Sequence, residues 1–295
     1  MHTLDKCPSC QATLFSDWLI CKDYTVSNQQ FKIVGCQKCG LKFTNPRPDE
    51  TEIGAYYESE AYISHTNEGK GLIDFVYRQV RKLAVKSKIE LINNLRTNKG
   101  QLLDIGCGTG YFMSQAKENG WVVAATEPGQ KPREEAARLA QIEVKETIFD
   151  LDRQGGGKPY DIVTMWHVLE HVHELHGTIG WIKDHLTTNG KLVVAVPNHE
   201  SYDAKVFQEH WAAYDVPRHL YHFSATSMRE LMLQHRLKIE TIKPMKFDTF
   251  YVSLLSTKYK YGVTKPLQAF WTGLLSNLKA DQKQYSSLIY VISKI

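Results

Sequence analysis

The chain beyond residue 99 alternates short apolar runs with segments of helical period. The runs are Leu102 to Ile105, Trp121 to Thr126, Ile162 to Met165 and Leu192 to Val196. Strands separated by helices in this way favour a parallel sheet with helices on both faces. Two further runs, Leu237 to Ile242 and Ser287 to Ile292, follow near the end of the chain. We therefore predict an α/β, doubly wound fold in which the aromatic-rich insertion 247–285 separates the last two strands.

A longer helical pattern precedes this alternation. Between Leu72 and Leu95, apolar residues return every three or four positions with basic residues between them, which predicts an amphipathic helix. The stretch 45–48 reads NPRP and predicts a rigid, extended linker, because each proline fixes its own φ and disfavours helix in the residue before it. We therefore divide the chain into a module at 1–45, a linker with a helical cap at 46–98, and a large domain at 99–295.

The composition is that of an ordinary folded protein. Of 295 residues, 42% are hydrophobic and 23% are charged, and no low-complexity tract argues for disorder. No apolar run approaches the roughly 20 residues of a membrane-spanning helix, and the opening segment lacks the apolar core of a signal peptide, so we expect a cytoplasmic protein. The net charge of +4 includes no long basic run, which makes nucleic acid an unfavoured partner. The oligomeric state is left unpredicted.

Four of the six cysteines form two pairs, each with two residues between its members. The pairs are Cys7 with Cys10 and Cys36 with Cys39. Two such pairs can place four thiolates around one tetrahedral zinc ion, and a closed shell of four thiolates indicates a structural site. Four free thiols or a redox pair are the alternatives. Cys21 and Cys107 fall outside the pairs and are expected to be spectators.

A glycine-rich turn follows the first apolar run of the sheet. The segment 101–110 reads QLLDIGCGTG. Gly106, Gly108 and Gly110 allow backbone N–H groups to approach a ligand at the carboxyl edge, where open α/β sheets bind ligands. Glu127 ends the next run, where a carboxylate can accept both ribose hydroxyls of an adenosine. Dinucleotide-binding folds share this logic, but their G-x-G-x-x-G pattern is not met here.

This turn, with an acid closing the second strand, closely resembles the first two motifs of class I S-adenosylmethionine-dependent methyltransferases. The resemblance covers residues 101–295 and implies a Rossmann-like, seven-stranded sheet that binds S-adenosyl-L-methionine. It also implies that Asp104 orients the methionine amino group and that the three glycines line the methionine and the adenosine. Phe149 and Asp150 would face the adenine.

A histidine-rich segment follows the run at 162–165. Its residues 167–171 read HVLEH and match the H-x-x-E-H pattern of inverted zinc peptidases. A peptidase would carry this pattern on a long helix, whereas here it directly follows a predicted strand in a chain that holds a cofactor signature. The segment also resembles the VLEHV stretch of small-molecule methyltransferases, which places His167 near the methionine end of the cofactor. We therefore prefer the methyltransferase interpretation.

The methyl acceptor is expected to dock beside the segment 211–223, which is dense in aromatic residues and histidines. Methyl transfer is assisted by a base that removes the acceptor's proton, and histidine suits that role near neutral pH. The segment resembles one in sugar C-methyltransferases, which implies His219 as the base. The rival candidates are His222, His167 and Tyr221. That family has a glutamate where this chain has Arg218, so O-methylation is at least as well supported as carbon methylation.

The cysteine pairs resemble the N-terminal zinc-binding module of sugar C-methyltransferases and of methyltransferases encoded with bacterial surface-glycan genes. They also resemble the zinc modules of some ribosomal RNA methyltransferases. We predict methyl transfer to a small molecule, at a sugar or glycan-related hydroxyl or carbon. RNA methylation is one alternative, although the motif that holds an exocyclic base nitrogen is absent after the run at 162–165. A non-catalytic adaptor that binds the cofactor is another, and formation of S-adenosylhomocysteine would exclude it.

Overall fold

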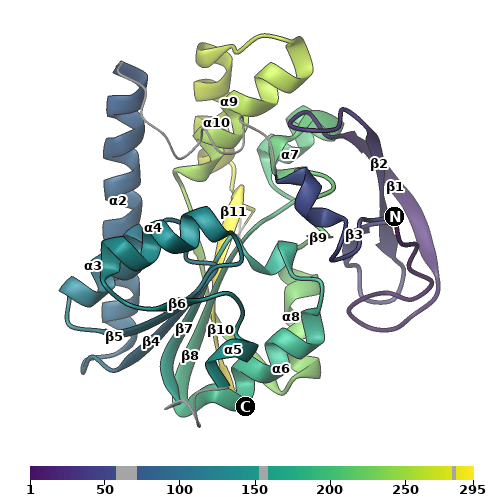
Figure 1. Cartoon of the computed structure of the whole chain (residues 1–295). Helices are drawn as coiled ribbons and strands as arrows, with labels where there is room; N and C mark the ends of the chain where they lie inside the picture. Colours follow the sequence, from purple (N-terminus) through teal and green to yellow (C-terminus); the bar gives the residue numbers. More distant parts are fainter. Residues whose placement is uncertain (58–71, 153–158, 281–283) are drawn as a thin grey trace.

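Figure 1 shows the computed structural model of the chain, which describes residues 1–57, 72–152, 159–280 and 284–295. In the helix at 72–95, side chains are described from residue 82 onward. Part of the predicted linker (58–71) and part of the predicted insertion (281–283) therefore lie outside the described residues.

The large sheet has seven strands in the order β10-β11-β8-β7-β4-β5-β6. The strands are β4 (Gln101–Ile105), β5 (Val122–Thr126), β6 (Val144–Lys145), β7 (Tyr160–Trp166), β8 (Leu186–Pro197), β10 (Leu237–Pro244) and β11 (Ser287–Lys294). All neighbouring pairs are parallel except the two that involve β11, which runs antiparallel to β8 and to β10. The predicted Rossmann-like, doubly wound sheet is confirmed. All six apolar runs form strands, and only the two-residue β6 was not foreseen.

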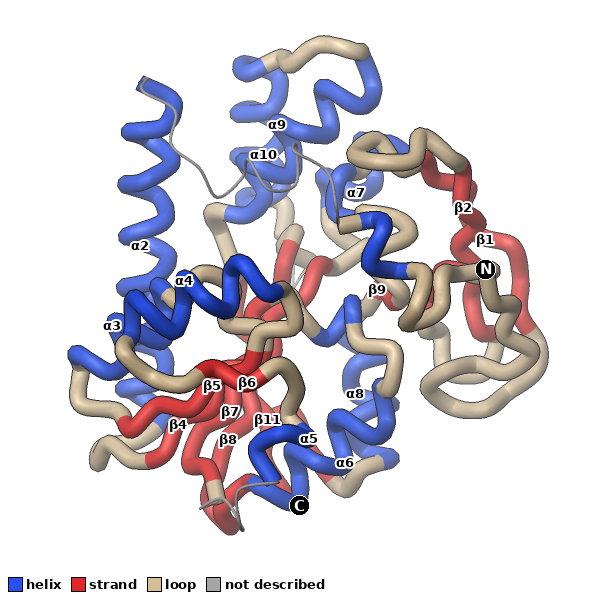
Figure 2. Tube along the Cα trace, in the orientation of Figure 1, coloured by secondary structure: helices blue, strands red, loops and turns tan. Residues whose placement is uncertain are grey.

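Helices cover both faces of this sheet (Figure 2). On one face lie α2 (Leu72–Leu95), α3 (Tyr111–Glu118) and α4 (Gln130–Ala140); on the other lie α5 (Phe149–Asp152), α6 (Leu175–His185) and α8 (Ala225–Gln234). Successive strand side chains point to opposite faces, so Leu102 packs with Ile92 of α2, whereas Leu103 joins the cluster that contains Ile179 of α6. The predicted amphipathic helix Leu72 to Leu95 is α2, with the same bounds.

The N-terminal residues form a second sheet, which also includes one strand from the distant segment 211–223. Its order is β1-β2-β3-β9, with β1 (Phe15–Lys22), β2 (Gln30–Cys36), β3 (Lys42–Thr44) and β9 (Tyr221–His222). Phe43 of β3 pairs with Tyr221 of β9, and both side chains belong to the hydrophobic cluster under α6 and α8. The N-terminal strands thus share hydrogen bonds and core with the rest of the chain. The domain boundaries at residues 45 and 98 stay a prediction.

The predicted aromatic insertion is a helical hairpin between β10 and β11. It consists of α9 (Asp248–Tyr261) and α10 (Pro266–Leu278), and it stands above the carboxyl ends of the parallel strands, next to α7 (Tyr202–Phe207) (Figure 1). Short 3-10 turns complete the fold: η1 (Ile53–Tyr56), η3 (Leu169–His171), η4 (Gln208–His210) and η5 (Ala212–Tyr214). Among the described residues, no helix combines the length and apolarity needed to cross a membrane.

Candidate active site

Asp104, near the carboxyl end of β4, is a buried carboxylate with one open oxygen. Its Oδ1 accepts a 2.6 Å hydrogen bond from the Thr164 hydroxyl on β7. Its Oδ2 has no hydrogen-bond partner among the residues that the structure describes. Burial raises the pKa of Asp104 to about 7, against the opposing effects of Thr164 and Lys88. A buried acceptor without a partner is costly, so this oxygen suits a ligand that brings a donor or a positive charge.

The glycine turn after β4 leaves room for a ligand at one position and packs tightly at the two others. Gly106, Gly108 and Gly110 all have positive φ, at 68°, 54° and 83°. A Cβ on Gly106 would lie 2.5 Å from Cγ2 of Val168, and one on Gly110 would lie 2.8 Å from Cα of Ala136. A Cβ on Gly108 would meet no described atom within 4 Å. Gly108 therefore borders open space, while Gly106 and Gly110 permit close packing with Val168 and with α4.

Glu127, just after β5, ties the end of that strand to the glycine turn. Its Oε2 accepts the Gly108 N–H at 2.9 Å, and its Oε1 accepts the Gly129 N–H at 3.0 Å. Burial raises the pKa of Glu127, and these two N–H groups oppose that rise. Each oxygen keeps a lone pair that can accept a ligand hydroxyl.

Phe149 and Asp150 begin α5, beyond β6. The Phe149 ring is largely exposed. Asp150 accepts hydrogen bonds from the N–H and the hydroxyl of Thr147, at 3.1 and 2.9 Å. Asp150 therefore stabilises the start of this helix, and its predicted contact with adenine stays a prediction.

Lys88 of α2 brings a positive charge to the same region, which sequence reasoning missed. Its Nζ lies 4.5 Å from the ring centre of Trp166, the last residue of β7. Burial lowers the pKa of Lys88, while attraction to Asp104 and Asp248 opposes that effect. The only sequence signal was the basic stripe of the amphipathic helix.

His167 follows β7 in a left-handed conformation, with φ of 59°. Its Nε2 lies 2.9 Å from Oδ2 of Asp248, the first residue of α9, and its Nδ1 lies 3.2 Å from Oε1 of Glu170. Burial alone would lower the pKa of His167, but the two carboxylates outweigh it and raise the pKa to about 10. The ring is therefore protonated at neutral pH and holds both carboxylates. It has no site that can accept a further proton.

Glu170, His171 and His219 form a compact buried group beside His167. One ligating atom from each lies within 4.8 Å of the others, and the two histidine rings are 4.6 Å apart in an edge-to-face arrangement. Nδ1 of His219 donates to the Ala213 carbonyl oxygen at 2.9 Å, and its Nε2 lies 3.9 Å from Oδ2 of Asp215. Oε2 of Glu170 is buried and has no partner within the described chain. The group has the geometry to accept a proton, and its spacing would also suit a metal ion.

His171 remains neutral within this group. Its Nδ1 lies 3.1 Å from the Arg218 carbonyl oxygen. Burial, and then the neighbouring His219, lower the pKa of His171 to about 4. The peptidase interpretation fails on this geometry, since residues 169–171 form a single 3-10 turn and His219, instead of His167, completes the group.

Comparison with known proteins decides the family. The family described as "Methyltransferase domain" matches residues 77–242, which is more than half of the chain. The chain belongs to this methyltransferase family. The prediction of an enzyme in the S-adenosylmethionine-dependent methyltransferase class is confirmed.

Curated relatives of this methyltransferase are distant. The ubiquinone biosynthesis O-methyltransferase of Rickettsia conorii (strain ATCC VR-613 / Malish 7) is 24% identical over 200 residues, which cover 63% of this chain and 68% of the relative. The enzyme of the same name from Rickettsia felis (strain URRWXCal2) is 22% identical over 160 residues, which cover 51% of this chain and 66% of the relative. Among solved structures, magnesium protoporphyrin IX methyltransferase from Synechocystis PCC 6803 with bound SAH aligns with a TM-score of 0.54 and 15% identity, over 84% of this chain and 100% of that one. This last likeness shows a shared fold.

The aromatic residues of the methyltransferase's segment 211–223 lie in the core and do not line an open docking surface. Trp211, Tyr214, Tyr221 and Phe223 are all buried. Trp211 donates from its indole nitrogen to Asp203 of α7 at 2.7 Å. The aromatic residues that we expected at a docking surface therefore form an internal layer. The ionisable side chains next to this layer are Glu170, His171 and His219, which we call the histidine group.

His222 lies in the contact between the two sheets of the methyltransferase. The Thr44 hydroxyl donates to the His219 carbonyl oxygen at 2.8 Å, so Nε2 of His222, 3.2 Å from the same hydroxyl, acts as a donor. Burial holds the pKa of His222 well below its usual value. This side chain connects β9 to β3 and lies outside the group of Glu170, His171 and His219.

Arg218 stands where the sugar C-methyltransferases have a glutamate. In this methyltransferase its side chain connects the segment 211–223 to the N-terminal strands. Its Nη2 lies 3.1 Å from Oδ1 of Asp23 and 2.7 Å from Oδ1 of Asp215, and its Nη1 donates to the Tyr56 carbonyl oxygen at 3.1 Å. Burial alone would lower the pKa of Arg218, but the two carboxylates outweigh this effect. The pKa of Arg218 therefore lies above its usual value. Sequence reasoning missed both carboxylates, because each is a single acid with no motif around it.

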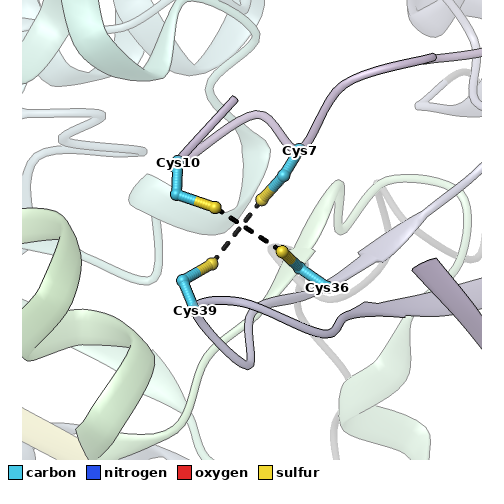
Figure 3. Close-up of side chains that lie close together, drawn as sticks. All are labelled: Cys7, Cys10, Cys36 and Cys39. Carbon is cyan, nitrogen blue, oxygen red and sulfur yellow. Dashed lines mark hydrogen bonds between the residues drawn. The ribbon is translucent and has the colours of Figure 1, made fainter. Parts of the chain in front are cut away.

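The four paired cysteines of the methyltransferase converge on one point (Figure 3). Cys7 and Cys10 come from the N-terminal loop, Cys36 ends β2, and Cys39 lies in the following turn. The Sγ atoms of Cys7 and Cys39 are 3.6 Å apart, and those of Cys10 and Cys36 are 3.5 Å apart. Tetrahedral zinc with Zn–S distances of about 2.3 Å requires sulfurs roughly 3.8 Å apart, so the cluster fits a zinc ion. Cys21 lies apart, buried against Phe31 and Trp211.

Proposed function

We propose that this methyltransferase transfers a methyl group from S-adenosylmethionine to a hydroxyl of a small acceptor molecule. The buried open oxygen of Asp104 next to the Gly108 turn carries the proposal, because it suits an ammonium group at the carboxyl edge of the sheet. The relatives named above are O-methyltransferases, which favours oxygen as the acceptor atom.

Four residues would hold the cofactor. Asp104 would accept a hydrogen bond from the methionine ammonium, and Glu127 would accept hydrogen bonds from the ribose hydroxyls. Gly108 leaves the space through which the ligand passes close to the backbone. Lys88 supplies a positive charge for the methionine carboxylate. When bound, S-adenosylmethionine supplies an electrophilic methyl group on a positively charged sulfur.

His219 would act as the general base. The acceptor oxygen forms a bond to the methyl carbon as the carbon–sulfur bond breaks and its electron pair stays on sulfur. The hydroxyl proton would pass to Nε2 of His219, because Nδ1 is already engaged as the donor to the Ala213 carbonyl. Asp215, whose Oδ2 lies 3.9 Å from Nε2, and the nearby Glu170 would stabilise the resulting imidazolium. His167, held protonated by Asp248, positions Glu170 and takes no proton itself.

For the acceptor we retain a sugar or glycan-linked hydroxyl as the first class to test, and ubiquinone precursors as the second because of the relatives' names. Purified enzyme should be given labelled S-adenosylmethionine with nucleotide sugars, lipid-linked glycans, ubiquinone precursors and RNA, side by side. Transfer to a small-molecule hydroxyl supports the proposal, and transfer to RNA alone overturns it. No S-adenosylhomocysteine with any acceptor would favour the non-catalytic adaptor.

A chelator arm of the same assay tests the role of the histidine group. Turnover that survives removal of divalent cations supports His219 as the base. Loss that added Mg²⁺ or Mn²⁺ restores would assign Glu170, His171 and His219 to a metal instead.

We also propose that Cys7, Cys10, Cys36 and Cys39 hold a structural zinc ion. Three of these side chains are buried within the hydrophobic cluster that contains Leu220 and Tyr221, so loss of zinc should destabilise the whole chain. Elemental analysis should find about one zinc per chain, and Cys36→Ser should lose the metal, whereas Cys21→Ser should keep it. Undamaged protein without zinc would refute the site.

A further inference from the structure

The hairpin α9–α10 buries small residues and exposes large apolar ones, which reverses the usual pattern of a surface helix. Its buried residues are Thr249, Ser253, Ser256 and Thr257 on α9, and Ala269, Thr272, Gly273 and Ser276 on α10. A Cβ on Gly273 would lie 2.8 Å from Cδ1 of Phe250, so the two helices approach closely. Small residues on the inner face and large apolar residues on the outer face leave apolar side chains exposed to solvent.

The large apolar residues of α10 lie on one outward face. Leu267, Phe270, Trp271 and Leu278 are 79%, 52%, 57% and 72% exposed. At about 100° per residue they fall within an arc of roughly 100°, opposite the buried small residues. Val263, in the turn between the helices, is 60% exposed and extends this apolar surface. Monomeric proteins rarely leave such a continuous patch to water, so it marks a surface that meets a partner.

Apart from Asp248, which is paired with His167, the charges of the hairpin are all positive. Residues 249–280 contain four lysines and no aspartate or glutamate. The lysines, Lys258, Lys260, Lys265 and Lys279, are all exposed. Nζ of Lys265 lies over the ring of Tyr261, 3.7 Å from its centre. Exposed aromatic and aliphatic residues flanked by lysines suit the headgroup region of an anionic bilayer.

The dimensions restrict how the hairpin could meet a bilayer. The helices have 14 and 13 residues, so each is about 20 Å long, which is shorter than the roughly 30 Å hydrocarbon core. The hairpin can therefore lie in the interface but cannot span the membrane. A symmetric contact with a second copy would bring the same lysines together without a carboxylate from 249–280 to pair with them.

We propose that the hairpin α9–α10 docks onto the surface of an anionic lipid bilayer, with the outward face of α10 in the interface. Asp248, the first residue of α9, is paired with His167, so the hairpin that docks is in direct contact with the candidate site. The docking surface stands independently of which acceptor is methylated.

Sedimentation with vesicles tests this inference on the full chain. The protein should bind vesicles of phosphatidylcholine with phosphatidylglycerol much more tightly than vesicles of phosphatidylcholine alone. Leu267→Ser and Trp271→Ser should each weaken the partition by on the order of tenfold, because each removes one buried apolar side chain. Lys265→Gln should weaken binding only to the anionic vesicles, by roughly fivefold. Leu233→Ser, at an exposed leucine on α8, is the matched control and should leave binding unchanged.

Two further measurements complete the test. The tryptophan emission should shift to shorter wavelength on vesicle binding, and Trp271→Phe should lose that shift while methyl transfer to a water-soluble acceptor persists. Failure to bind anionic vesicles would overturn the inference. A dimer in solution that Trp271→Ser converts to a monomer, without vesicle binding, would assign the face to a second copy.

Discussion

Nη2 of Arg218 lies 3.1 Å from Oδ1 of Asp23, and both side chains are buried. Asp23 follows β1 and also accepts the N–H groups of Thr25 and Ser27, at 2.9 and 2.7 Å. Arg218 directly precedes His219, so this ion pair fixes the acceptor segment against the N-terminal strands. The position of the proposed base therefore depends on a loop made almost two hundred residues earlier.

Arg218→Met should destabilise the protein by about 3 to 5 kcal/mol, because it leaves the buried carboxylate of Asp23 and the partly buried carboxylate of Asp215 without their partner. Lys32→Met is the control, because the Lys32–Asp17 pair on β1 and β2 is exposed and should contribute less than about 1 kcal/mol. Urea unfolding of both variants checks this. Equal losses of stability in the two variants would show that the Arg218 ion pair stabilises the fold no more than the exposed Lys32–Asp17 pair.

The pattern of the sequence was sufficient for the large sheet but not for the small one. A run of apolar residues indicates a buried strand. Each strand from β4 to β11 that is longer than two residues contains such a run. β6 and β9 have two residues each, which is too short for any period to appear. The pairing of β9 with β3 depends on how distant segments pack, and no local pattern encodes it.

Asp104→Asn and Glu127→Gln should each weaken S-adenosylmethionine binding by about 1 to 3 kcal/mol, because each removes a carboxylate that we assign to polar groups of the cofactor. Titration calorimetry measures this effect directly. Glu118→Gln, at an exposed position on α3, is the control and should bind like the wild type. Unchanged affinity in both site variants would refute the assigned cofactor site.

His219→Asn should lower turnover by on the order of 10² to 10⁴ while cofactor affinity stays near that of the wild type. Asparagine keeps a donor for the Ala213 carbonyl but has no nitrogen that can take a proton. Steady-state kinetics with an identified acceptor and calorimetry with the cofactor separate the two effects. Near-normal turnover would place the base elsewhere, and loss of cofactor binding would show that His219 supports the fold.

The contribution of His171 and His199 to the stability of the protein should decrease as the pH falls from about 6.5 toward 4. Burial lowers the pKa of His171 to about 4 and that of His199 to about 3, so in this range the unfolded chain takes up protons that the folded chain does not. Each such histidine lowers the free energy of unfolding by up to about 1.4 kcal/mol per pH unit. His167, with its pKa raised to about 10, contributes stability that is complete below pH 6.5 and is lost as the pH rises through 10.

Urea midpoints at pH 7 and pH 5, at constant ionic strength, measure this loss. His199→Leu removes one of the responsible groups and should reduce the difference between the two midpoints. An identical difference in the variant would exclude His199 as a source.

The part of the candidate site that lies in neighbouring stretches of the sequence could be predicted. The part that is formed by several distant segments could not. Asp104, the glycines and Glu127 lie on two successive strands, so their motif is local in sequence. The histidine group combines η3 with His219, and Asp248 reaches His167 from the hairpin, so only the folded chain brings them together. Lys88 could not be distinguished from the other basic residues of its helix.

The pairing of β3 with β9 also affects the order in which the chain can fold during synthesis. A ribosome that has released residues 1–45 has produced the four clustered cysteines and three strands, but the outer edge of β3 has no partner until residues 221–222 emerge. Unpaired strand edges are prone to aggregate, and the nascent chain carries this one until residues 221–222 emerge. Strands β1 to β3 are thus made before the large sheet, but their sheet is completed only after most strands of the large sheet have left the ribosome.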